Sequence, residues 1–133
     1  MPTVIVAVDQ DDDRARRQAA TLRSLEFDPA ATRIRLVHVF QDNPEGATIA
    51  QVGAVRRARE LLEDAGFDVT LEGRSGEPAD EIVAAADEHD ADLICVAGRK
   101  RTPAGKALFG SVTQDVFLTT DRPVLLSSRP AED

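Results

Sequence analysis

The sequence contains almost no lysine: two residues, Lys100 and Lys106, stand against 14 arginines. With 15 aspartates and 9 glutamates the formal net charge is −8. A generic nucleic-acid-binding domain is basic, so this composition argues against nucleic acid as a partner. An acidic, lysine-poor chain suits solubility in concentrated salt, and a halophilic source is one interpretation. A GC-rich genome that favours arginine is the other, and composition leaves both open.

The chain also has only one cysteine, which excludes an intramolecular disulfide. Cys95 lies in the apolar run LICVA, so we expect a small buried side chain rather than a reactive thiol. No apolar run approaches the ~20 residues of a membrane span, and the start MPTVIVAVD lacks the basic residues of a secretory signal. We therefore expect a soluble, cytoplasmic protein with no membrane partner, folded as one domain over residues 1–133.

Apolar runs and helical patterns alternate along the chain. Continuous or alternating apolar runs predict five strands, at residues 3–9, 33–40, 67–74, 92–98 and 122–128. Helical spacing of apolar residues predicts four helices, at residues 10–27, 47–65, 75–89 and 110–119. The inner strands are apolar throughout, which is typical of a parallel sheet with helices on both faces. The sequence therefore predicts a doubly wound α/β fold.

One basic loop stands out in this acidic chain. The stretch GRKRTPAGKALFGSV, residues 98–112, holds four cations and three glycines and no acid. It follows a predicted strand and leads into a predicted helix, where ligands bind in open α/β sheets. The helix N-terminus offers unpaired N–H groups, and Gly110 lets a ligand approach the backbone. The loop is thus a candidate phosphate site, although Ser111 as a helix cap and cations that balance nearby acids explain it equally well.

The chain resembles the universal stress protein family from VIVAVD to PVLLSS. The family's landmarks occur in order: a first strand that ends in Asp9, LVHVF in the second strand, AGFDVTLEGRSGEPADEIVAAADEHDADLICVAG, and FGSVTQDVFLTTDRPVLL. The resemblance implies a five-stranded parallel sheet with strand order 3-2-1-4-5. It also implies a homodimer that pairs through the last strand, and, in one branch of the family, binding of ATP or AMP.

The family's nucleotide site can be carried over residue by residue. Asp9 matches the acid beside the ribose or a bound metal such as Mg²⁺, although capping the turn into the next helix explains it as well. Val39 matches the residue whose backbone pairs with adenine. Gly98, with Gly110, Ser111 and Val112, matches the phosphate loop, and we add Arg99 as a nearby cation.

The loop departs from the family pattern at two points. Arg101 replaces the second glycine of the motif, and the spacing from Arg101 to Gly110 is one residue short. Gly105 is an additional glycine that could take over part of the role. An arginine resists backbone dihedrals that glycine permits, so the departure bears on triphosphate geometry in particular.

Two functions follow, from different classes. The first is a stress-response regulatory protein that binds an adenine nucleotide, ATP or AMP. The second is a nucleotide-free dimeric interaction protein that keeps the fold without the pocket. A response regulator is excluded because no Asp ends the third strand and no Lys follows the fifth. No nucleophile–base set lies at the strand ends, so we expect no enzyme beyond slow, incidental ATP hydrolysis.

Overall fold

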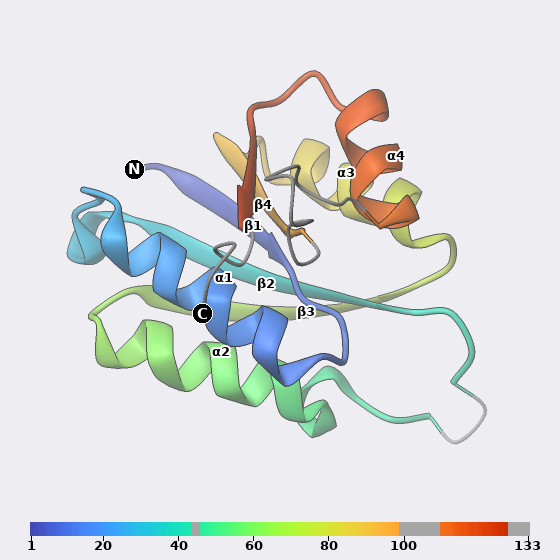
Figure 1. Ribbon diagram of the computed structural model, residues 1–133, viewed down its shortest axis with the longest axis horizontal. Coiled ribbons are helices and arrows are strands. Elements are labelled where there is room, and N and C mark those ends of the chain that lie inside the picture. Colours follow the sequence, from blue (N-terminus) through green and yellow to red (C-terminus); the bar gives the residue numbers. More distant parts are fainter. Residues whose placement is uncertain (44–45, 99–109, 128–133) are drawn as a thin grey trace, which may run out of the picture.

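The computed structural model describes residues 1–43, 46–98 and 110–127 (Figure 1). Five strands alternate with four α-helices, as the sequence predicts. The strands are β1 (Thr3–Ala7), β2 (Arg33–Phe40), β3 (Asp68–Ser75), β4 (Leu93–Ala97) and β5 (Val124–Ser127). The helices are α1 (Asp12–Ser24), α2 (Gly53–Asp64), α3 (Pro78–Glu88) and α4 (Ser111–Thr119), with short 3₁₀ turns at Pro29–Ala31 and Ile49–Gln51.

The strands form one parallel sheet in the order β3-β2-β1-β4-β5. This confirms both the doubly wound fold and the expected strand order. The order reverses between β1 and β4. The connections that leave these two strands therefore run to opposite edges of the sheet and over opposite faces. At their carboxyl ends such a reversal opens a crevice, which is where ligands bind in this class of sheet.

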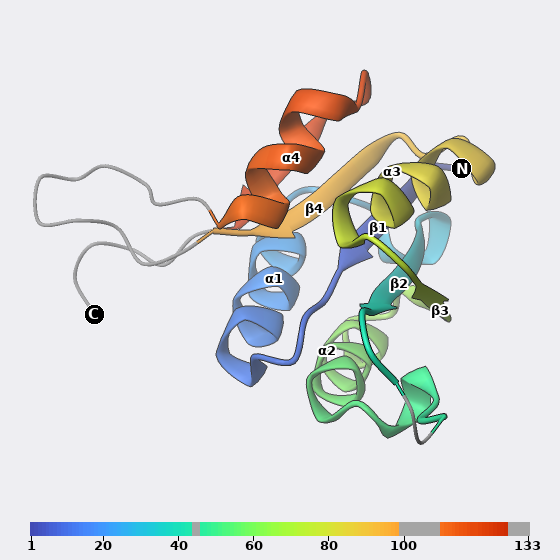
Figure 2. The ribbon, with the colours of Figure 1, turned by 90° about the vertical axis from the view of Figure 1, so that its right-hand side faces the viewer.

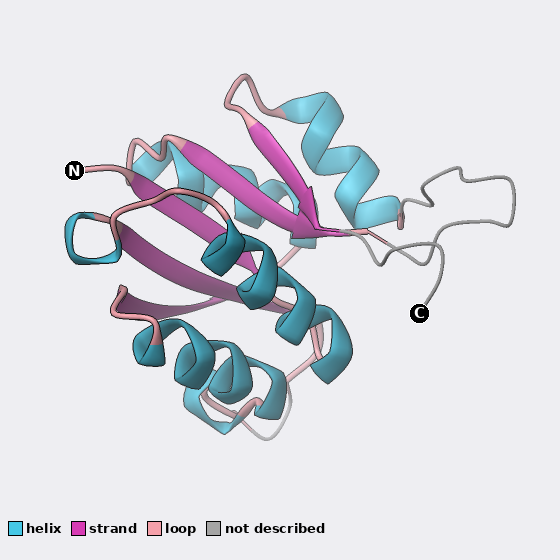
Figure 3. Cartoon of the chain, turned by 60° about the vertical axis from the view of Figure 1, so that its left-hand side comes forward, coloured by secondary structure: helices cyan, strands magenta, loops and turns pink. Residues whose placement is uncertain are grey.

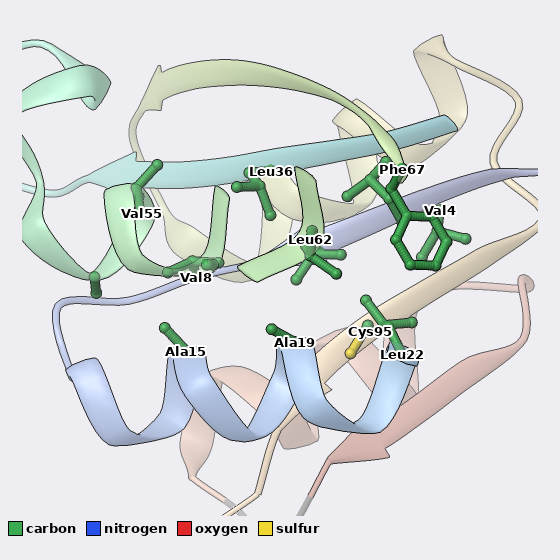
Figure 4. Packing of buried hydrophobic residues seen from close by; sticks show 14 residues of the cluster. Val4, Val8, Ala15, Ala19, Leu22, Leu36, Val55, Leu62, Phe67 and Cys95 are labelled. Carbon is green, nitrogen blue, oxygen red and sulfur yellow. The ribbon is translucent and has the colours of Figure 1, made fainter. Parts of the chain in front are cut away.

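Helices cover both faces of the sheet (Figures 2 and 3). Helices α1 and α2 lie on one face, where they bury alternate residues of β1 and β2, among them Val4, Val6 and Leu36. Figure 4 shows Ala15, Ala19 and Leu22 of α1 pointing into this cluster, and Leu22 is fully buried. Helices α3 and α4 cover the other face. None of the helices in the described ranges is long and apolar enough to cross a membrane.

The element ends differ from the predicted ones at several elements, most clearly at two helices. The predicted helix 10–27 ends at Ser24, and Leu25, which is apolar and lies at helical spacing after Leu22, is an exposed C-cap residue. The predicted helix 47–65 is split: Thr48 and Gln51 form a capping box around a 3₁₀ turn, and α2 begins only at Gly53. Local side chain–backbone hydrogen bonds therefore replace the helix there.

Candidate functional site

A pocket of about 720 Å³ opens at the carboxyl ends of β1, β2 and β4. This volume is within the range of small-molecule sites. Its lining comes from the strand ends and from the N-terminal parts of three helices. The lining residues are Ala7–Asp11, Arg14, Val37–Asp42, Pro78, Ile82, Val96, Ala97, Val112 and Thr113.

One wall of the pocket is apolar. Val39 near the end of β2 faces α3, whose Ile82 lies in the same buried cluster. Val96 of β4 and Pro78 at the start of α3 extend this wall. The predicted residue Val39 is therefore part of the pocket, in a position where a flat apolar ligand would meet both its side chain and the end of a strand.

Asp9 lies at the polar rim and is already engaged by the protein. Its Oδ1 accepts a hydrogen bond from the N–H of Asp11 at 2.8 Å, and its Oδ2 lies 2.9 Å from Nη1 of Arg14. Asp11 in turn caps α1 by accepting the N–H of Arg14, which lowers the pKa of the Asp11 carboxyl. Asp9 thus orders the turn into α1, while about half of its side chain stays exposed at the pocket; its role beside a ribose or a metal stays a prediction.

The first turn of α4 forms another part of the lining. The first intrahelical bond of α4 runs from the N–H of Gln114 to the carbonyl of Gly110, so the three preceding N–H groups have no acceptor within the helix. The N-cap Gly110 has no side chain to satisfy them, and the first turn contains no acid. Val112 and Thr113 bring this turn to the pocket, where an anion would be stabilised.

Thr113 fixes α4 to the sheet. Its Oγ1 donates a hydrogen bond of 2.9 Å to the carbonyl of Ala97, the last residue of β4, and the side chain is buried. The contact joins the helix N-terminus to the strand end that borders the same pocket. Sequence inspection missed Thr113, although its place three residues after Gly110 could have drawn attention to it.

The glycines predicted to bind phosphate do not line the described part of the pocket. Gly98 is buried and its N–H donates to the carbonyl of Ser127 at 2.7 Å, which ties β4 to the end of β5. Gly98, Gly110 and Ser111 are not among the described residues that line the pocket. Arg99, Arg101 and Gly105 lie outside the described residues.

Several pocket residues were not predicted from the sequence, because they lie on helices and their spacing there does not indicate a site. Arg14 is a surface residue of an amphipathic helix by its spacing, and Ile82 reads as a core residue. The two come into one site only because α1 and α3, on opposite faces of the sheet, both begin beside the same strand ends. His38 also lines it, with Nδ1 donating to the carbonyl of Val8 at 2.7 Å. That contact links two neighbouring strands.

A second cluster of titratable groups lies on β3 and α3, away from the pocket. Within the described ranges, only Glu72, Glu88 and His89 bring their ligand atoms within 4.8 Å of one another as metal ligands would. Arg74 donates to Glu72 and Glu88, and His89 to Glu72 at 2.8 Å. The guanidinium group supplies the positive charge that a metal ion would bring, and the contacts raise the pKa of Arg74 further above its ordinary value, with Glu88 the main cause. We interpret the cluster as an ion-pair network.

Comparisons with known proteins agree with this geometry. Residues 1–128 match the family model described as the universal stress protein family. A universal stress protein from Mycolicibacterium smegmatis is 36% identical over 80 residues, which is 59% of this chain and 62% of that protein. Alignments cover 42% to 62% of the length of the curated relatives that match.

Two solved structures resemble the chain over nearly its whole length. A universal stress protein from Archaeoglobus fulgidus in complex with dAMP is 25% identical, with a TM-score of 0.70 over 95% of this chain and 97% of that one. A universal stress protein in complex with cAMP is 27% identical, with a TM-score of 0.68 over 94% of each chain.

Proposed function

The chain belongs to the universal stress protein family, and from this premise we propose that it is a stress-response regulatory protein that binds an adenine nucleotide, AMP or ATP. One observation carries the proposal. The crevice where the strand order reverses holds a pocket that is apolar on one side and ends at a helix N-terminus on another. A nucleotide has the same division, an aromatic base at one end and an anion at the other.

The base would lie against the apolar wall. Val39 offers a backbone N–H and carbonyl at the end of a strand, and Ile82 with Val96 would cover the ring. The sugar would lie near Asp9, whose carboxylate oxygens have further lone pairs for hydroxyl groups. The dAMP and cAMP complexes of the two similar proteins support the choice of an adenine ring.

The phosphate would meet the first turn of α4. The N–H groups of Ser111, Val112 and Thr113 precede the first bond within the helix, and Thr113 keeps them at the end of β4. Four cations of the sequence stretch 98–112, among them Arg99 and Arg101, would add attraction. We propose binding of the nucleotide and assign no residue as a base for its hydrolysis.

Mg²⁺ would matter for a triphosphate more than for a monophosphate. Three carboxylates, those of Asp9, Asp11 and Asp42, line the described part of the pocket with one cation, Arg14. Carboxylate oxygens are ligands that Mg²⁺ accepts, and the ion would relieve their repulsion of added phosphate groups. We expect ATP binding to depend on Mg²⁺ and AMP binding to be nearly independent of it.

Calorimetric titration of the protein with AMP, ADP and ATP, each with and without Mg²⁺, tests the function. Replacement of Gly110 by Val should weaken binding at least tenfold, because a branched side chain blocks approach to the backbone. Gly53→Val is the matched control at the start of α2, where an added Cβ meets nothing closer than Arg56 at 3.9 Å. No heat with any nucleotide, and no nucleotide released from the purified protein on denaturation, would leave the nucleotide-free interaction protein as the better description.

We further propose a homodimer that pairs through β5. This strand has one neighbour, β4, within the described sheet, so its other edge presents unpaired backbone groups. In α4, just before it in the chain, Phe117 and Leu118 are 60% and 74% exposed. Pairing of two such edges would remove the exposed backbone groups from water.

A further inference from the structure

Gln18 is a fully buried polar side chain in a cluster of apolar ones. It lies on α1, on the helix face that also carries Ala15 and Leu22. Its Nε2 donates to the carbonyl of Ala7 at 2.8 Å and approaches the carbonyl of Cys95 at 3.4 Å. Both partners are acceptors only, so the nitrogen end of the amide must face them. One side chain therefore contacts the last residue of β1 and the middle of β4 at once.

These two strands separate at the level of Gln18. The pairing of β1 with β4 ends at Val6 opposite Cys95, whereas β1 continues with β2 to Ala7 opposite Val37. Beyond this point Ala7 and Ala97 both line the pocket. The amide of Gln18 thus bridges the strands where their own pairing stops and the pocket begins.

The amide is costly to bury. Among the described residues, no donor lies within hydrogen-bonding distance of Oε1 of Gln18, and this atom is shielded from solvent. An unsatisfied buried acceptor destabilises a folded protein. Methionine has a similar length and would fill the same volume without this penalty. What glutamine adds, and methionine cannot, is the pair of contacts to Ala7 and Cys95.

We propose that Gln18 is a positioning residue of the nucleotide pocket: its amide sets the separation of the ends of β1 and β4, and through them the placement of Asp9 and of the α4 N-terminus. The chain of contacts is continuous. Ala7 lies two residues before Asp9, and Cys95 two residues before Ala97, whose carbonyl holds Thr113. The affinity part of this inference rests on the proposed nucleotide function; the strand-end part does not.

The first test needs no nucleotide. Amide hydrogen exchange is measured in the parent, in Gln18→Met and in a control, Leu22→Val or Leu22→Ala, chosen to match the loss of Tm. Leu22 is buried one turn further along the same helix. The N–H groups of Val8 and Gly98, bonded to Val37 and Ser127, report on the two strand ends. We expect them to exchange at least tenfold faster in Gln18→Met than in the control. Equal rates in the two variants would overturn the proposal.

The second test is affinity. Gln18→Met should weaken AMP binding about tenfold or more, while the Leu22 control stays within about twofold of the parent. Parent-like affinity in Gln18→Met would refute the positioning role even if the parent binds AMP well. If the parent binds no nucleotide, the proposed function fails, and the exchange experiment still decides whether Gln18 holds the strand ends.

A conservative variant separates positioning from mere folding. A neutral carboxyl group introduced by Gln18→Glu can donate one O–H to the carbonyl of Ala7, and an ionised one cannot. Because position 18 is fully buried, we expect the pKa of the introduced carboxyl group to be raised, so that the group is neutral near pH 5 and ionises as the pH rises. The affinity of Gln18→Glu, relative to the parent at the same pH, should therefore be closest to that of the parent near pH 5 and fall as the pH rises to 8. A constant ratio across this range would contradict the proposal.

Discussion

The guanidinium group of Arg14 lies 2.9 Å from the carboxylate of Asp9, from Nη1 to Oδ2, at the rim of the pocket. Arg14 also approaches Asp11 at 3.8 Å. It is the only cation among the described residues that line this pocket, whose described lining also contains three carboxylates. The pair therefore holds Asp9 in place and at the same time offsets negative charge that would oppose an anionic ligand.

Replacement of Arg14 by Gln should weaken AMP binding about fivefold to tenfold, or about 1 kcal/mol. Adenosine, which has no phosphate, should lose less than about twofold, because the missing charge acts mainly on the anion. Arg16→Gln is the matched control, since Arg16 pairs with Asp12 on the same helix but does not line the pocket. Calorimetric titration with both ligands measures the difference. An equal loss for AMP and adenosine would contradict this electrostatic role.

Thr113→Val removes the hydroxyl that holds α4 to the carbonyl of Ala97 and changes the volume little. We expect a loss of about 1–2 kcal/mol in the free energy of unfolding, because the buried carbonyl loses its donor. AMP affinity should fall several-fold as the first turn of α4 shifts. Urea unfolding and titration of Thr113→Val are compared with Thr119→Val, at the exposed end of the same helix. Equal affinities in the two variants would show that Thr113 does not position the turn.

The Glu72 network predicts a loss of stability in acid. Burial by itself raises the pKa of the Glu72 carboxyl, but hydrogen bonds from Arg74 and His89 outweigh it and hold the pKa below its ordinary value. A carboxyl group with a lowered pKa stabilises the fold above the pKa of the unfolded chain, and this stabilisation is lost as the pH falls through the folded value. The stability of the parent should therefore decrease below about pH 4.5.

Glu72→Gln provides the test of that network. At pH 7 it should cost about 1.5–3 kcal/mol, the range for hydrogen bonds to charged groups. Between pH 5 and pH 3 its stability should fall less steeply than that of the parent, because the titrating group is gone. Glu26→Gln, at an exposed position after α1, is the control. Urea unfolding at several pH values gives the slopes, and parallel slopes for parent and Glu72→Gln would refute the assignment.

Salt should stabilise the protein if its composition is a halophilic adaptation. Asp9, Asp11, Asp12 and Asp13 crowd the start of α1, and the chain as a whole carries a net charge of −8. Screening relieves such repulsion. We expect Tm to rise by several degrees from low to molar KCl. A flat or falling Tm would favour genome composition as the reason for the scarce lysine.

The proposed dimer predicts a molar mass of about twice 14.4 kDa. Light scattering at micromolar concentration and high salt measures it. Val124→Pro removes a backbone N–H from the first residue of β5 and should reduce pairing between the two protomers. A proline further inside β5 would also disturb the pairing of β5 with β4. Leu118→Ser, on exposed α4, is a gentler comparison. A monomeric mass for the parent would contradict the proposed dimer through β5.

Much of the fold could be predicted because local pattern and global arrangement agree. The apolar runs around Ile5, Ile34 and Ile94 are all buried strands, and the alternating run of β3 is the less buried edge. The helix ends were predicted less well. The chain leaves α1 three residues before the predicted end, and Thr48 with Gln51 forms its own turn, because short-range hydrogen bonds there outweigh apolar spacing.

The pocket could be predicted only where strands end. Asp9 and Val39 follow from the rule that ligands bind at strand ends, and Val112 from the helix start after the glycine. Arg14, Ile82 and Gln18 belong to helices, and their spacing indicates a solvent face or a core face without indicating a site. Their roles depend on how helices cross the strand ends, which no local pattern contains. The phosphate contacts predicted for Arg99, Arg101 and Gly105 stay predictions.

The thiol of Cys95 can report on local opening of the native protein at α1. The thiol is fully buried beneath α1, and burial, opposed in part by Gln18, raises its pKa to about 12. A thiol reagent can therefore attack only those molecules in which α1 has left the sheet. Because this is the only cysteine, the labelling rate reads one opening event without any engineered probe. If a nucleotide binds in the crevice, the labelling rate should fall. The size of that decrease would measure how strongly the ligand opposes opening, without calorimetry.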